Sequence, residues 1–570
     1  MADRATTRNS ISGNLLLVLL VGLPVFSYPL SWFPKSWAHF RYDCTLRLPE
    51  MVLAAGLLAS AVWFFRGRSS DGAGEGNVDL LPPRNVVLPL LAVVLSAVAS
   101  TRFSEYPQFG LPLLARLAGN LVIFLLAARA PKNRLGQLDK WWTLAAVVVA
   151  VNGLLRLGSE LEFISTFGNW DFLGTYLAAS LVIMVSRGGR WSVLGSLIIL
   201  TAMVFCRSRG AWLALGTVGL LWFLTFGDRF LKRGTTRVVL VMVILAGSAL
   251  LARPYMSRQW QTEVRPVIWK ATMGMIAARP LLGHGLGTYV AVYPRYRLPE
   301  YFLRLKATNV TDHAHNELLE VAAEQGLIGL AATLWLWVAA IRCGFRACRQ
   351  SKAADGRLLW GMFAVMLIFM LHSLLDVDLR YLPNQSFLWI LMGLAVGADA
   401  TSSQWRRITI QPLLPRRCLA GVCLALGVWI TVSAIFRPMA ADLQDRWARI
   451  AEERGDLLAA AQSARTALLF DPFRLSTRYL LAGVLSRLPD PTAQSMAIEQ
   501  CQRIEELAPD YADVTYNLGQ LYLLNGRPAE AVVYLRRAVE INPYDAERRA
   551  ILASALRSAE QNNEAPRQKM

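Results

Sequence analysis

The segment from residue 253 to residue 325 holds side chains that could act on an anionic substrate. His315 can exchange a proton near neutral pH, and Glu317 and Glu320 beside it could orient its ring. Arginine side chains can hold phosphate oxygens through paired N–H donors. Four arginines of this segment could do so: Arg265, Arg279, Arg295 and Arg297. The residue types therefore predict a phosphate-binding site with a general base.

The same segment lacks the patterns of a metal or nucleotide site. His313 and His315 alternate, so they would not share one face of a helix, and no ligand cluster has metal spacing. Residues 283–287 are glycine-rich but lack the Lys-Ser/Thr ending of a phosphate-binding loop. We therefore expect neither a metal ion nor a bound cofactor.

A second basic group, Arg207 and Arg209, lies in a very short turn between two apolar runs. Charges at a membrane boundary are costly unless they face water or a binding partner. These two arginines either extend toward lipid headgroups or form an anion site at the membrane surface.

The elements that must position these residues are membrane helices. The chain is 54% hydrophobic and only 17% charged, whereas soluble domains are about 45–50% apolar and about 25% charged. Runs of roughly 20 apolar residues predict about thirteen spans in an all-α, polytopic protein. Their centres lie near residues 22, 57, 93, 120, 149, 180, 198, 219, 245, 334, 367, 391 and 427.

The basic residues predict which joints between spans face the cytoplasm. If the N-terminus lies in the cytoplasm, each cytoplasmic connection between spans carries basic residues, for example Arg66, Arg129, Arg187, Arg229, Arg346 and Arg406. The 253–325 loop and the tail after residue 437 then lie outside. This distribution accounts for the net charge of +19 without nucleic-acid binding.

The chain after residue 437 differs in composition and forms a second domain, 438–570, following the membrane domain 1–437. Pro509 and Pro543 mark a period of 34 residues, and Gly519, Tyr522 and Leu535 fit the tetratricopeptide pattern of paired helices. We expect an α-solenoid of about three repeats that binds an envelope protein and does not form the active site. A plain helical hairpin is the alternative.

Three stretches of the membrane domain resemble the O-antigen ligase and polymerase superfamily. Residues 167–177 resemble the family's Gly-Asn-Pro-Asn helix start, although Trp170-Asp171 follows Asn169 here. Residues 208–212 resemble a second motif. The third motif is in the long loop: Arg265, Trp269, residues 280–283 and 285–287, His315, Asn316 and Leu319.

The resemblance implies metal-independent, inverting glycosyl transfer on the outer face of a bacterial plasma membrane. The donor would be a glycan on undecaprenyl diphosphate, bound by Arg209 and Arg265, with His315 as the general base. The acceptor stays open: another glycan, the lipid A core of lipopolysaccharide, or a protein hydroxyl. Five further residues could support the site: Asn169, Arg207, Arg279, Asn316 and Glu320.

Two other functions compete with this one. A transporter of a small anion such as bicarbonate could use His372, Asp376 and Asp378 to line a path. A non-enzymatic scaffold for envelope assembly would use only the tail. Convergence of Arg209, Arg265 and His315 in the folded chain would favour the glycosyltransferase.

Overall fold

The computed structural model describes residues 47–65, 77–130, 135–157, 165–167, 169–187, 189–206, 208–226, 264–305, 310–351, 353–399, 406–409 and 416–564. Arg207 and the span centres predicted near residues 22 and 245 lie outside these ranges. The described chain is helical except for one short antiparallel pair, β1 (Asn77–Leu81) with β2 (Arg406–Thr409). The sequence predicted no strands, because these four- and five-residue segments have no long alternating pattern.

The membrane bundle consists of α-helices in the part of the chain that the structure describes. All eleven predicted span centres within the described ranges fall inside helices. Among the described residues, four helices are long and apolar enough to cross a membrane, at residues 84–102, 107–128, 317–350 and 417–453. The bundle helices are α2 (Leu48–Phe65), α3 (Arg84–Arg102), α4 (Pro107–Ala128), α5 (Leu135–Leu154), α6 (Trp170–Arg187), α7 (Arg190–Cys206), α8 (Arg209–Phe226), α12 (Glu317–Gln350), α13 (Ala353–His372), α14 (Leu382–Ala398) and α15 (Arg416–Ile430).

The side chains of the bundle are sorted as in a protein surrounded by lipid. Trp142, Phe167, Tyr176 and Phe387 form a buried aromatic stack at its centre, with ring centroids 4.8 to 5.9 Å apart. Large aliphatic side chains point outward instead, and Leu95 is 65% exposed. A soluble bundle would cover such a surface, so these faces fit a hydrocarbon environment.

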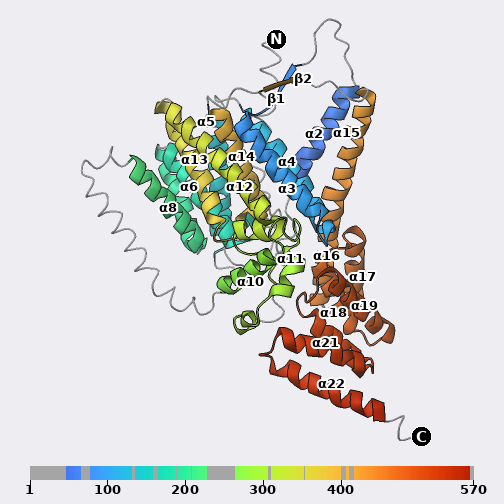
Figure 1. Cartoon of the computed structure of the whole chain (residues 1–570). Coiled ribbons are helices and arrows are strands. Elements are labelled where there is room, and N and C mark those ends of the chain that lie inside the picture. The colour runs from blue at the N-terminus through green and yellow to red at the C-terminus, as the bar shows by residue number, and fades with distance from the viewer. Residues whose placement is uncertain are drawn as a thin grey trace.

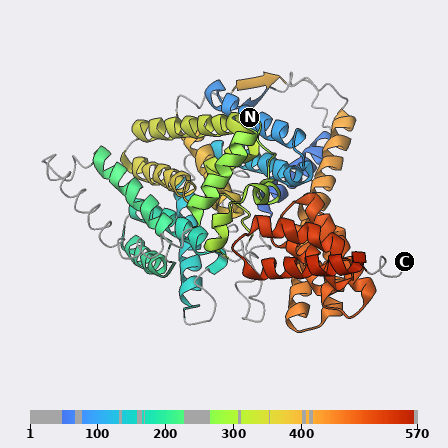
Figure 2. The ribbon, with the colours of Figure 1, turned by 60° about the horizontal axis from the view of Figure 1, so that its bottom comes forward.

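The long loop folds into short helices between the bundle and the tail (Figures 1 and 2). It contains α10 (Arg265–Ala278), α11 (Tyr289–Val292) and the 3₁₀ turns η6 (Tyr293–Tyr296) and η7 (Pro299–Leu303). Figure 1 places the tail at one end of the bundle and the β1–β2 pair at the opposite end.

Helix α12 is broken near its start by Gly326, whose backbone has φ 68° and ψ −172°. Four hydrogen bonds attach the broken turn to residues 280–285 of the loop, including Gly285 N to Glu324 O at 2.8 Å and Leu327 N to Pro280 O at 2.7 Å. A Cβ on Gly326 would lie 2.1 Å from Leu281 O. Only glycine fits this conformation and this close approach, so the glycine-rich loop fixes the first turns of α12.

The tail is reached through a continuous helix. Helix α15, the π-helical turn η9 (Thr431–Phe436) and α16 (Arg437–Glu453) follow one another without a break. Each tail helix then packs against the next. As expected from the sequence, Gly519 faces Leu535: a Cβ there would lie 2.5 Å from the Leu535 Cγ. The other tail helices are α17 (Leu457–Phe470), α18 (Leu475–Ser486), α19 (Pro491–Leu507), α20 (Val514–Leu524), α21 (Pro528–Ile541) and α22 (Ala546–Glu564).

Candidate active site

The centre of the site is Asp376, in the turn between α13 and the 3₁₀ turn η8 (Asp378–Arg380). Its Oδ2 lies 3.2 Å from Arg265 Nη2, and its Oδ1 lies 3.0 Å from His315 Nδ1. The Asp376 side chain is only 7% exposed, whereas those of Arg265 and His315 are 30% and 35% exposed. One buried carboxylate therefore holds an arginine and a histidine side by side, with both still accessible.

Asp376 is held as an anion. Burial by itself raises the pKa of Asp376, but His315, Arg265 and Asp171 outweigh it and lower that pKa well below its usual range. The backbone N–H of Val377 donates a further hydrogen bond to Oδ1 at 2.8 Å. If His315 Nδ1 carries the proton that this carboxylate accepts, Nε2 keeps its lone pair and can act as a base.

His315 stands on a strained turn just before α12. Its φ is +51°, a left-handed conformation that costs free energy for a residue other than glycine. The helix begins at Glu317, and Asn316 caps it: Asn316 Oδ1 accepts from Leu319 N at 3.1 Å. Asn316 Nδ2 also donates to Leu374 O at 2.9 Å. Asn316 thus joins the His315 turn to the turn that carries Asp376.

Helix α10 is attached to the same turn. Arg265 is its first residue, and one turn later the Trp269 indole N–H donates to Ala314 O at 2.9 Å. Two of the motif residues in the long loop therefore have related roles, because Trp269 fixes the helix that presents Arg265 beside His315.

The first two motifs meet behind Asp376. The carboxyl group of Asp171 lies close enough to that of Asp376 for the two to interact directly. Ser208 Oγ donates to Asp171 Oδ1 at 2.7 Å, and Asn169 Oδ1 accepts from Asp171 N at 2.7 Å. Arg209 follows Ser208 as the first residue of α8, and it is exposed. The backbone that carries Arg209 is thereby fixed to the Asp376 cluster.

A buried histidine completes this region. His372 Nδ1 lies 2.7 Å from Asp378 Oδ2, and both side chains are almost fully buried. A Cβ on Gly210 would lie 2.5 Å from His372 Nε2, so the glycine of the second motif allows α8 to reach His372. The three polar residues that could have lined a transport path, His372, Asp376 and Asp378, all have charged neighbours within this cluster.

Two of the supporting residues proposed from the sequence lie in other networks. Arg279 Nη2 binds Glu105 Oε1 at 2.7 Å, and Arg295 binds the other oxygen of Glu105 at 3.0 Å. Glu320 was expected to orient His315, but it binds His313 Nδ1 at 2.8 Å and the backbone N–H of Ala314 at 2.8 Å. The carboxylate that holds His315 is Asp376.

Sequence reasoning missed the role of Asp376, and it missed Arg380. Arg380 is 13% exposed and binds three carboxylates, those of Glu317, Glu320 and Glu324, at 2.7 to 3.5 Å. Asp376 lies 61 residues from His315 and 111 from Arg265. The available signal was a set of charged residues directly after an apolar helix, since buried charges at a membrane boundary need partners.

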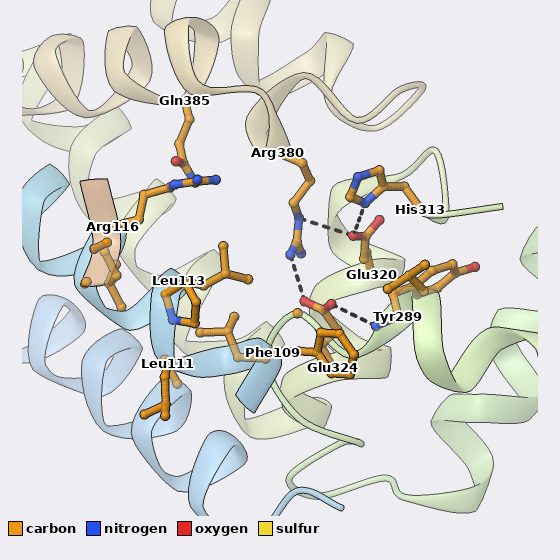
Figure 3. Close-up of a pocket in the computed structure, with 18 of the residues that line it drawn as sticks. Phe109, Leu111, Leu113, Arg116, Tyr289, His313, Glu320, Glu324, Arg380 and Gln385 are labelled. Atoms are coloured by element: carbon orange, nitrogen blue, oxygen red, sulfur yellow. Dashed lines mark hydrogen bonds and ion pairs between the residues drawn. The ribbon is translucent and has the colours of Figure 1, made fainter. Parts of the chain in front are cut away.

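A cavity of about 910 Å³ lies beside the His315 turn. His313, Glu320, Glu324 and Arg380 form its polar end, and Figure 3 shows them facing the side chains of Arg116 and Gln385 across the space. His315, Arg265 and Asp376 are not among the residues that line it. The neighbouring residues His313 and His315 thus belong to two different environments.

Two models of known protein families match this chain. Residues 194–334 match the family model described as O-antigen ligase, and residues 358–556 match the model described as virulence factor membrane-bound polymerase, C-terminal. A search of curated proteins finds no match. The first region includes Arg209, Arg265 and His315, and the second includes Asp376 and most of the tail. This chain therefore belongs to the O-antigen ligase and polymerase superfamily of membrane proteins.

Proposed function

We propose that this protein transfers a glycan from undecaprenyl diphosphate to an acceptor hydroxyl at the outer face of a bacterial plasma membrane. The observation that carries the proposal is the meeting of Arg265 and His315 on the buried carboxylate of Asp376. A guanidinium beside a histidine suits a reaction in which a diphosphate leaves while a hydroxyl loses its proton.

In the proposed reaction, His315 Nε2 takes the proton of the acceptor hydroxyl. The hydroxyl oxygen attacks the anomeric carbon of the donor from the face opposite the diphosphate, so the configuration inverts. The bond between that carbon and the diphosphate oxygen breaks, and undecaprenyl diphosphate leaves with the electron pair. Arg265 and Arg209 stabilise its charge, and Asp376 stabilises the protonated His315. None of these steps uses a metal ion.

The orientation and the tail belong to the same proposal. The tail helices lie at the end of the bundle that carries Arg265 and His315 (Figure 1). At the opposite end of the bundle, basic residues lie at or just after helix ends: Arg129 after α4, Arg187 at the end of α6 and Arg346 in the last turns of α12. The positive-inside rule assigns this end to the cytoplasm. We infer that the site and the tail are both extracytoplasmic, and that the tail is a tetratricopeptide-type solenoid that also binds an envelope protein.

The test separates donor binding from the chemical step. The purified protein, in lipid nanodiscs, receives a synthetic undecaprenyl diphosphate glycan, and donor binding and transfer are measured separately. His315→Ala should slow transfer by on the order of 10²–10⁴ and keep donor binding. Arg265→Ala and Arg209→Ala should each weaken donor binding by about 1.5–3 kcal/mol, and lysine should restore little of it.

Arg304→Ala is the matched control, because Arg304 is an exposed arginine of the same loop. It should behave like the wild type. Normal turnover in His315→Ala, or equal donor binding in Arg265→Ala and Arg304→Ala, would refute the mechanism.

A further inference from the structure

The lining of the 910 Å³ cavity combines the polar end formed by His313, Glu320, Glu324 and Arg380 with many apolar side chains (Figure 3). Its volume is near the upper end of the roughly 300–1,000 Å³ usual for small-molecule sites. Apolar side chains of the lining come from α4, α12 and α14, among them Leu113, Leu336 and Trp389. The π-helical turn η9 contributes Ser433 and Ala434, and π turns inside helices are frequent at functional sites.

The charges of the cavity lining as a whole are balanced. Four arginines and five carboxylates line the cavity. Arg116 binds Glu50 at 3.0 Å, Arg380 binds Glu324 at 2.7 Å, and Arg474 is paired with Asp442. A diphosphate would need an excess of positive charge, as on the Arg265 side of the His315 turn. Carboxylates instead accept hydrogen bonds from hydroxyl groups, so this lining suits a neutral, hydroxyl-rich molecule.

Aromatic side chains surround the same space. Phe109, Tyr289, Trp337, Phe473 and Tyr511 all line it. Flat aromatic surfaces can cover the apolar C–H faces of sugar rings while carboxylates bind the hydroxyl groups between them. The lining therefore has both kinds of contact that a glycan offers.

The tail forms part of the cavity wall. Residues 470–476, between α17 and α18, line it together with Tyr511. Arg437 holds this turn by donating to Phe470 O at 3.0 Å and Leu469 O at 3.2 Å. Arg297 of the long loop donates to Asp510 O at 3.2 Å and Ala512 O at 3.4 Å, beside Tyr511. The Arg297 bonds thus fix the tail against the long loop.

We propose that this cavity is the acceptor site, formed jointly by the membrane bundle and the tail, and that the acceptor is a lipid-anchored neutral glycan. The sugars lie between His313, Arg380 and the tail turn 470–476, and the hydrocarbon lies among α4, α12 and α14. His313 and His315 are two residues apart, which places their Cα atoms within about 7 Å of each other. A hydroxyl group bound near His313 would therefore lie close to His315, the proposed base. This inference rests on the proposed function, and it departs from the expectation that the tail stays outside the active site.

The test uses a photoactivatable alkyl oligosaccharide without phosphate, added to the full-length protein in lipid nanodiscs. Labelled residues are found by mass spectrometry. Thr333→Trp fills the cavity, because Thr333 lines it, whereas Leu334→Trp places the same side chain on the 39% exposed outer face of α12. We expect Thr333→Trp to reduce labelling at least about tenfold and Leu334→Trp to leave it unchanged.

The tail variants test the second half of the inference and do not depend on repacking the bundle. Phe473 lines the cavity, and Leu469, four residues earlier, does not. Phe473→Ala should reduce labelling severalfold relative to Leu469→Ala. In the wild type, labels should appear both on α4 or α14 and on the tail turn.

Several results would overturn the assignment: equal labelling of Thr333→Trp and Leu334→Trp, labels outside the cavity, displacement of the probe by the undecaprenyl diphosphate donor, or displacement by a serine-containing peptide. Failure of the proposed function would give a different result. The wild type would not transfer glycan, while Thr333→Trp would still reduce probe labelling and Leu334→Trp would not. His315→Ala separates the two, because it should slow transfer by on the order of 10²–10⁴ and leave labelling as in the wild type.

Discussion

Asp376 holds both Arg265 and His315, so its own substitution tests whether the two act together. Asp376→Asn keeps the size of the side chain but removes the charge and offers one acceptor oxygen in place of two. We expect kcat to fall by at least about tenfold, and by less than in His315→Ala, because the base remains but loses its orientation and its counter-charge. The measurement is kcat and KM for transfer from the synthetic donor.

Asp399→Asn serves as the control for that experiment. Asp399 is also buried and also binds an arginine, Arg346 at 2.8 Å, but at the opposite end of the bundle. Its substitution should leave kcat per folded molecule unchanged. If Asp376→Asn also leaves kcat unchanged, Asp376 does not position the base.

His313 should make the stability of the protein depend on alkaline pH. Burial alone lowers the pKa of His313, but the Glu320 carboxylate outweighs it and raises that pKa to about 9. Because the folded-state pKa exceeds the ordinary value, the ion pair contributes fully below about pH 6.5 and is lost as the pH rises through about 9. The Tm of the wild type should therefore fall between pH 6.5 and 10 by more than the Tm of His313→Gln. Parallel Tm curves for the two proteins would contradict this ion pair.

The sequence could identify His315 and Arg265 because their residue types are informative in any context. It could not identify what holds them. Asp376 comes from a different helix junction, and the hydrogen bonds that bring it to His315 depend on how α10, α12 and α13 pack. The same holds for Glu320. It lies near His315 in sequence but binds His313, because the helix begins at Glu317 with Asn316 as its cap.

At the scale of the elements, the position of the active site depends on the break in α12. Gly326→Ala should destabilise the protein by about 3 kcal/mol or more, since the alanine would combine a left-handed backbone with a clash against Leu281 O. The matched control is Gly216→Ala on α8, where a Cβ meets nothing within 4 Å. Thermal unfolding of the two variants in nanodiscs measures the difference. Equal Tm values would show that the 280–285 loop does not fix α12.

Helix positions were predictable and helix irregularities were not. A run of about 20 apolar residues is sufficient to place a membrane helix, so span centres such as those at residues 93 and 334 fall inside α3 and α12. The break at Gly326 leaves little trace in composition, because it depends on contacts with residues 280–285, and the π turn at residues 431–436 was not predicted either. The pair of strands β1 and β2 was missed for the same reason, as its two partners are more than 300 residues apart.

At the scale of the whole molecule, the orientation in the membrane can be tested with reporters. A phosphatase that is active only outside the cytoplasm should be active when fused after Glu564, at the end of α22. The same fusion with green fluorescent protein, which does not fluoresce when exported unfolded, should be dark. Fused after Ala398, at the end of α14, the two reporters should give the opposite result. Phosphatase activity at Ala398 alone would reverse the orientation.

The unbroken helix from α15 through η9 into α16 connects the membrane to the tail as a rigid strut rather than a tether. Each residue of an α-helix adds about 1.5 Å of length and about 100° of rotation. The height of the tail above the bilayer and the direction it faces are therefore both set by residue count. Natural variants of this strut should differ by whole turns, about 7 or 11 residues, since a change of one or two would turn residues 470–476 away from the cavity. The reach of the enzyme toward its glycan would then be a property encoded in the length of one helix.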